Sequence, residues 1–252
     1  MSGPDPGLAS SSSVDRLEEN LRAVRERIAA AARAAGRDPA GVRLLAVSKT
    51  WPAEDVAALA ALGQREFAEN RVQELTAKVA TLAGDAATAD LRWHLVGQVQ
   101  RNKAAAAVRL DVVVHSVDRV PLAEALARAA LTAGRVLDVF VQVDLGGPPG
   151  RDGARGGVPP GEVPALADAV AASEGLRLRG LMAVAPRGED PAPAFARLAD
   201  VAARVCADHP DARELSAGMS ADLEAAVTAG ATVVRVGTAL FGSRPLASDR
   251  GE

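Results

Sequence analysis

The chain has 252 residues and a formal net charge of -3, with 48% hydrophobic and 24% charged residues. This composition is typical of a soluble globular protein with one large or two small domains. No dense block of lysine and arginine occurs, so charge gives no reason to expect binding to nucleic acid or an anionic membrane. No apolar stretch is long enough to span a bilayer, and residues 1–13 lack the features of a signal peptide.

Cysteine and histidine are scarce. Cys206 is the one cysteine, so no intramolecular disulfide can form, and a reducing cytoplasm is the simplest location. It falls in an Ala/Val-rich helical stretch, where we expect inert packing. The three histidines and this cysteine have no metal-ligand spacing, so no metal site is expected.

The first periodic segment predicts a helix from Val14 to about Ala35, because its apolar residues recur every three or four positions. Residues 42–48 then form a short apolar run, as in a strand buried on both sides. Pro52 suits the first turn of the next helix. This strand-then-helix pair repeats. Strands are expected to begin near residues 42, 65, 91, 111, 136, 176, 213 and 232, and helices to cover 53–62, 71–82, 102–108, 121–133, 162–173, 192–207 and 221–229.

Strict alternation predicts a parallel sheet, because parallel strands need crossover connections. Eight strands at this length favour a single closed (β/α)8 barrel, a TIM barrel, preceded by an extra helix. A doubly wound open sheet is the alternative. We expect the barrel over residues 14–244, with flexible tails at 1–13 and 245–252.

A closed barrel would bring chemistry-bearing residues together, since its site lies where the strands end and strand eight adjoins strand one. Lys49 ends the first apolar run, and its amine could form a Schiff base with an aldehyde, although a lysine there is often only a solvated terminus. Arg235 interrupts the apolar run of residues 233–236, where a cation needs a partner. That partner could be a glutamate on a neighbouring strand, or a ligand's ring nitrogen or anion.

Three small residues near the last two strand ends favour a phosphate site. Gly237 and Thr238 offer backbone N–H groups and a hydroxyl, and Ser220 precedes the helix expected from residue 221. Taken singly, the glycine could belong to a turn and the serine could be a helix cap.

Other polar residues have two interpretations each. Asn70 could line the site or only cap a helix, and His94 could line the site or be a satisfied interior histidine. The glycine-rich segment from Gly146 to Gly157 is predicted to be a flexible loop, with a lid over the site as the alternative.

Seven phrases together resemble those of the pyridoxal-phosphate homeostasis proteins, in the same order over roughly residues 15–244. They are AVSKT, FAENRVQE, WHLVGQVQRNK, VHSVDR, GLMAVAP, LSAGMSADLEAAV and VRVGTALFG. The resemblance implies the fold of the alanine racemase barrel domain, the third fold type of pyridoxal 5'-phosphate (PLP) proteins. It further implies that PLP forms a Schiff base with Lys49 and that Arg235 approaches the pyridine nitrogen. The phosphate would be held by Ser220, Gly237 and Thr238, and Asn70 and His94 would line the same pocket.

The sequence departs from the family's pattern at several places. Ala217 replaces a methionine before the phosphate serine, and Ala68 replaces a glycine. Residues 155–157 read RGG where the family has a lysine-x-glycine phrase. Relative to alanine racemase, Val184 stands where a ring-stacking histidine is expected. None of these changes removes an implied contact with the cofactor.

Three functions compete. A PLP-dependent amino-acid racemase of this type needs a lysine and a tyrosine, the latter on a separate β domain, but the sequence contains no tyrosine and ends soon after strand eight. A Schiff-base aldolase would explain the amine and the phosphate site but not the family phrases. The resemblance favours a carrier, which would hold PLP reversibly on Lys49 for sequestration and delivery, with no catalytic residues. Apo enzymes that require PLP are expected as transient partners, and a monomer is favoured.

Overall fold

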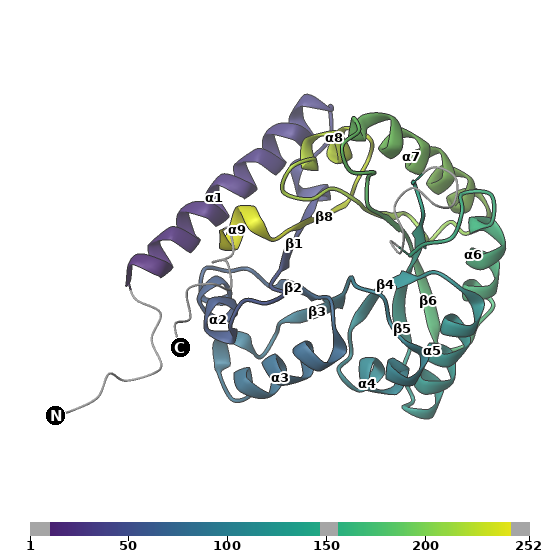
Figure 1. The fold of residues 1–252 in the computed structure, drawn as a ribbon, viewed down its shortest axis with the longest axis horizontal. Coiled ribbons are helices and arrows are strands. Elements are labelled where there is room, and N and C mark those ends of the chain that lie inside the picture. Colours follow the sequence, from purple (N-terminus) through teal and green to yellow (C-terminus); the bar gives the residue numbers. More distant parts are fainter. Residues whose placement is uncertain (1–10, 147–155, 243–252) are drawn as a thin grey trace.

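The computed structural model of the protein describes residues 11–146 and 156–242, and eight parallel strands close into a barrel in chain order, β1 to β8 (Figure 1). The TIM barrel prediction is confirmed, and the open-sheet alternative is wrong. The strands are β1 (Arg43–Val47), β2 (Glu66–Glu69), β3 (Arg92–Leu95), β4 (Val113–Val117), β5 (Leu137–Val143), β6 (Leu176–Ala183), β7 (Glu214–Ser216) and β8 (Val233–Val236).

Helices follow the strands around the outside of the barrel (Figure 1). They are α1 (Ser11–Ala34), α2 (Ala53–Ala61), α3 (Val72–Leu82), α4 (Ala104–Arg109), α5 (Val120–Thr132), α6 (Val163–Ala171), α7 (Pro191–Asp208), α8 (Leu223–Thr228) and α9 (Thr238–Phe241). Short 3-10 turns cover Pro39–Gly41, Ala86–Thr88 and Arg101–Lys103. None of the described helices is long and apolar enough to cross a membrane.

Several helix boundaries differ from the sequence-based expectation, each by no more than three residues. Helix α1 begins at Ser11, three residues before the expected start. Helix α8 begins at Leu223, not at residue 221, because Asp222 occupies the N-cap position. The predicted tails fall largely on residues 1–10 and 243–252, and most of the predicted glycine-rich loop falls on residues 147–155. These three segments lie outside the described residues.

The extra helix α1 covers the outside of the barrel next to the last elements of the chain. Its apolar side, formed by Leu17, Leu21, Val24 and Ile28, is buried. Helix α1 contacts α8 and α9, and Figure 1 shows it lying beside them along one side of the barrel. Two hydrogen bonds connect it to backbone carbonyls there: Asn20 Nδ2 donates to that of Leu240 in α9 at 2.8 Å, and Arg27 Nη2 donates to that of Ser220 before α8 at 3.0 Å.

Closure pairs the first strand with the last. Leu45 is in register with Arg235, and Ala46 with Val236. At the amino end of these strands, Arg43 forms ion pairs with Glu66 on β2 and Glu214 on β7. The residues that were predicted from the sequence to form the site lie at or near the opposite, carboxyl end of the strands.

Candidate functional site

Lys49 lies in a tight turn directly after β1, not at the end of the strand itself. The amide of Trp51 donates to the carbonyl of Ser48 at 3.0 Å, which closes the turn around Lys49 and Thr50. Thr50 has φ 68°, a left-handed conformation that β-branched residues rarely adopt. The side chain of Lys49 is exposed. Its amine forms no hydrogen bond or ion pair within the described part of the chain, so it is available to react.

Arg235 lies inside the barrel with 4% of its surface exposed, and no carboxylate among the described residues pairs with it. The glutamate ion-pair alternative is therefore wrong. Its Nη1 donates to Ser216 Oγ at 2.9 Å, and its Nη2 donates to the carbonyl of Ala183 at 2.8 Å. Burial lowers the pKa of Arg235 to about 10, so the guanidinium stays charged at neutral pH. Since it carries five N–H donors, others remain for a ligand.

A chain of buried side chains leads from Arg235 to His94. Ser216 Oγ lies 2.9 Å from His115 Nδ1, and His115 Nε2 lies 2.9 Å from His94 Nδ1. Because a guanidinium can only donate, we assign the Ser216 hydroxyl proton to the bond with His115. His115 then donates from Nε2, and the proton of His94 is left on its own Nε2.

Both histidines are neutral at physiological pH. Burial, followed by the charges of Arg92 and Arg43, holds the pKa of His94 well below 6.5. Burial, followed by His94 and Arg235, does the same for the pKa of His115. His94 is interior, as one of its two interpretations requires, but it is not fully satisfied. Its Nε2 has no hydrogen-bond partner in the described structure.

The three proposed phosphate residues come together although 17 positions separate the first two. Ser220 Oγ accepts a hydrogen bond from the amide of Ala239 at 3.2 Å, so it faces the start of α9, where Gly237 is the N-cap and Thr238 the first helical residue. A Cβ on Gly237 would lie 3.2 Å from the carbonyl oxygen of Val47. These residues therefore adjoin the end of β1, two positions before Lys49.

Asn70 is half-buried and follows β2 on the same rim. It is not the cap of α3, since Arg71 holds that position, so the helix-cap alternative is wrong. A hollow beside it is lined by side chains from the segments that follow β2 and β3, among them Gln73, Gln98, Gln100 and Lys103. Polar side chains thus form much of the lining of this hollow.

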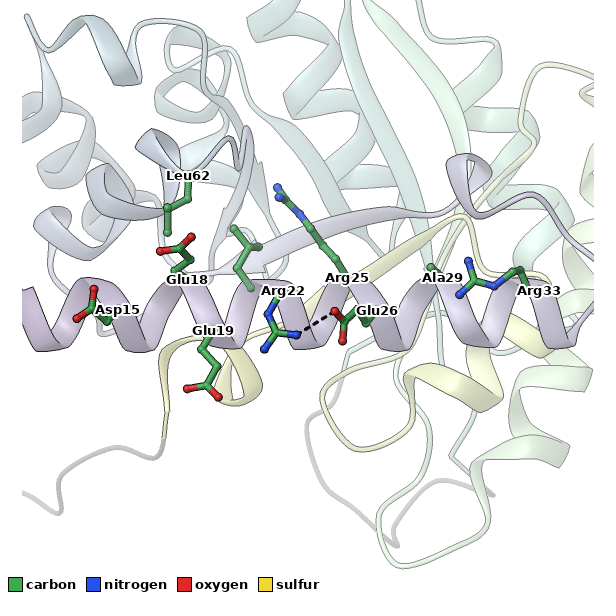
Figure 2. Close-up of a pocket in the computed structure, with 10 residues that line it drawn as sticks. Asp15, Glu18, Glu19, Arg22, Arg25, Glu26, Ala29, Arg33 and Leu62 are labelled. Atoms are coloured by element: carbon green, nitrogen blue, oxygen red, sulfur yellow. Dashed lines mark hydrogen bonds and ion pairs between the residues drawn. The ribbon is translucent and has the colours of Figure 1, made fainter.

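A second groove has no connection with this rim. It runs along α1 beside Leu62, at the end of α2, and Figure 2 shows its charged side chains on the outer helix. Arg22 and Glu26 pair at 3.0 Å with 63% and 64% of their side chains exposed. Such solvent-exposed pairs are ordinary surface features. Among the described residues, no group of three or more His, Cys, Asp or Glu side chains is placed to hold a metal ion.

Comparison with known proteins identifies the family. The family described as alanine racemase, N-terminal domain, matches residues 14–245. The chain is also 48% identical to the pyridoxal phosphate homeostasis protein of Mycobacterium tuberculosis, covering 92% of this chain and 94% of that protein. It belongs to the pyridoxal phosphate homeostasis protein family. Family members of the same name from Pseudomonas aeruginosa and Escherichia coli are 45% and 37% identical, each over 90% of this chain and over 96% and 97% of their own lengths.

Solved structures support the same assignment. PipY of Synechococcus elongatus PCC7942, solved with PLP bound, is 38% identical with a TM-score of 0.77, over 90% of this chain and all of that chain. An alanine racemase of Clostridium difficile 630 has a TM-score of 0.68 at 18% identity, over 92% of this chain and 58% of that chain. The second likeness concerns the fold alone. It confirms the predicted similarity to the racemase barrel.

Several residues that support the site were not predicted from the sequence. His115 and Ser216 fall within two of the family-like phrases, VHSVDR and LSAGMSADLEAAV, without a predicted role. Both are polar residues in strands with buried neighbours, a signal that could have placed them inside the barrel. Glu69 and Lys78, which are buried beneath the Lys49 turn, were also missed.

Proposed function

We propose that this protein binds PLP as a reversible Schiff base on Lys49, and that it sequesters and delivers the cofactor without a dedicated catalytic reaction. One observation carries this proposal: Lys49, just after β1, has an exposed amine, and Arg235, on the adjacent β8, has a buried guanidinium, and neither has an ion-pair partner within residues 11–146 and 156–242. The family names and the PLP-bound relative support the choice of ligand.

The residues present fit PLP, whose aldehyde condenses reversibly with a primary amine. Lys49 supplies that amine. Arg235 offers N–H donors to the pyridine nitrogen, and it is held in place by Ser216 and the carbonyl of Ala183. The hydroxyls of Ser220 and Thr238 and the amide groups at the start of α9 suit the phosphate, and Gly237 keeps the space next to β1 open.

Arg235 also argues for a carrier. A guanidinium that stays protonated at neutral pH donates to the pyridine nitrogen and does not give it a proton. An unprotonated ring withdraws electrons weakly, so it stabilises a carbanion poorly. The sequence has no tyrosine to act as the second base of a racemase. Exchange of one amine for another at the cofactor aldehyde needs neither feature.

The first test is spectroscopic. Protein purified with PLP should be yellow, and borohydride should attach the cofactor covalently to Lys49, as mapped by mass spectrometry. Lys49→Ala should abolish this attachment. Lys103→Ala is the matched control, because Lys103 is another amine on the same rim. Attachment to a different lysine in the Lys49→Ala protein, at the wild-type yield, would refute the assignment.

A second test separates carrier from enzyme. Loaded protein is incubated with L-alanine and other amino acids, and separately with a PLP-requiring apo enzyme. We expect activation of the apo enzyme and no catalytic turnover of the amino acids. Multiple turnovers to the D-amino acid or to an amine would overturn the carrier proposal. A transient partnership with apo enzymes, a monomeric state and a cytoplasmic location remain predictions.

A further inference from the structure

A buried ion cluster lies directly beneath the turn that carries Lys49. Lys78, on α3, is 6% exposed and Glu69, at the end of β2, is fully buried. Lys78 Nζ donates a hydrogen bond to Glu69 Oε1 and lies 3.5 Å from Glu74 Oε1. Glu74 and Lys78 are four positions apart on α3, with the acid nearer the N-terminus, which is the favourable order for such a pair.

Every member of this cluster also bonds the Lys49 turn. Lys78 Nζ donates to the carbonyl of Ser48 at 2.5 Å, the same carbonyl that closes the turn. The Ser48 hydroxyl donates to Glu69 Oε1 at 2.7 Å. The amide of Thr50, the residue with positive φ, donates to Glu74 Oε1. Residues on both sides of Lys49 are thus held by charged groups from β2 and α3.

We propose that Lys78 is a positioning residue, which with Glu69 and Glu74 holds the turn in the conformation that presents the Lys49 amine to the cofactor. This inference rests on the proposed function and deepens it by naming the residues that orient the Schiff-base lysine. A strained backbone such as that of Thr50 persists only where its surroundings over-determine it, and such strain concentrates at functional sites.

A contribution to the stability of the fold is by itself a poor explanation for this buried ion cluster. Burying charges costs free energy, and an apolar group of similar volume often serves packing as well or better. Burial is the largest influence on Glu69 and raises the pKa of its carboxyl despite the opposing bonds from Lys78 and Ser48. In addition, Glu69 Oε2 has no hydrogen-bond partner within the described structure. The specific contribution of the cluster is to the turn, which receives a donor and two acceptors.

The test compares two cations that each bridge two carboxylates. Lys78→Met removes the cation under the turn. Arg43→Met is the matched control, since Arg43 bridges Glu66 and Glu214 at the amino end of the barrel. The double variant Glu69→Gln, Lys78→Met removes both buried charges of one pair and leaves neither unpaired. It can therefore replace Lys78→Met in the test if that single variant does not fold. Wild type and Lys49→Ala are measured in parallel.

Three quantities are measured: the urea midpoint of the apo protein, the PLP dissociation constant, and hydrogen exchange of the apo peptide spanning residues 48–51. Both single variants should lower the urea midpoint. Only the Lys78 variants should raise the PLP dissociation constant and speed hydrogen exchange at Thr50. The expected rise is about tenfold, which corresponds to the loss of one supporting hydrogen bond. The double variant should regain stability relative to Lys78→Met without regaining affinity.

The outcomes separate the two proposals. Wild-type affinity and slow exchange at Thr50 in the double variant would overturn the positioning role, even if stability fell. Equal loss of affinity in Arg43→Met would overturn it too, because the effect would then be global. A different observation would refute the role of Lys49 as the Schiff-base lysine: borohydride attachment of PLP to another residue in the wild-type protein. Hydrogen exchange at Thr50 in the apo protein would still report on the role of Lys78, because it does not depend on PLP.

Discussion

The two buried histidines should make this protein sensitive to mild acid. In the native state His94 and His115 are at most 2% exposed, and burial keeps the pKa of each well below 6.5. In the unfolded chain both regain an ordinary pKa of about 6.5. The unfolded state therefore binds more protons below this pH, so stability that is complete above pH 6.5 is lost as the pH falls toward the native pKa values.

The size of the loss follows from proton linkage. Between pH 7 and pH 5.5, protonation stabilises the unfolded state by about 1.3 kcal/mol for each histidine with a pKa near 6.5. The pair then gives a loss of about 2.5 kcal/mol. Domains are typically stable by about 5–15 kcal/mol, so this change is large enough to measure. Arg235, Arg43 and Arg92 add positive charge around the two rings, which opposes their protonation in the folded state.

The assay is urea unfolding at several pH values from 7 to 5.5, for the wild type and for His94→Gln and His115→Gln singly and together. Each single variant should remove about half of the acid-induced loss. Carboxyl groups remain in all proteins, so their effects cancel in the comparison. This matters for Glu69, whose pKa is raised by burial and whose contribution to stability grows as the pH falls toward 4.5. An equal loss in wild type and double variant would refute the reasoning.

Three further predictions concern backbone and charge. Gly180→Ala should destabilise the protein by more than about 3 kcal/mol, roughly the cost of severe overpacking, because its Cβ would lie 1.8 Å from the carbonyl oxygen of Glu214. Gly36→Ala is the control: Gly36 also has a positive φ, but a Cβ there would meet no atom within 4 Å, so the variant should lose about 1–2 kcal/mol in the same denaturation assay. Arg235→Met should leave the free energy of unfolding unchanged or raise it by about 1–2 kcal/mol, yet weaken PLP binding at least about tenfold; parallel loss of stability and affinity would contradict this. Thr50→Gly should relieve about 1 kcal/mol of backbone strain and raise the urea midpoint without tightening PLP binding, and a lowered midpoint would show that the positive φ is not strained.

The sequence by itself determined the order and type of the elements. Apolar spacing of three to four residues, or near-continuous apolar runs, reports local burial, and these signals placed the eight strands and the helices around the barrel. They also placed Lys49, Ser220 and Gly237 near strand ends. Local patterns predicted the start of α8 less well, because Asp222 and not Ser220 occupies its N-cap.

Only the tertiary structure decided which polar groups meet. Arg235 lies beside Leu45 because the barrel closes, and Ser216 reaches His115 across 101 positions of sequence. Lys78 reaches the carbonyl of Ser48 because α3 contacts β2, the strand that pairs with β1. Such pairings depend on strand register and on which side of each strand faces inward, and neither is encoded in a short window of residues. The sequence could therefore indicate the reactive lysine, whereas the residues that hold its turn and the acceptors that hold Arg235 were revealed by the fold.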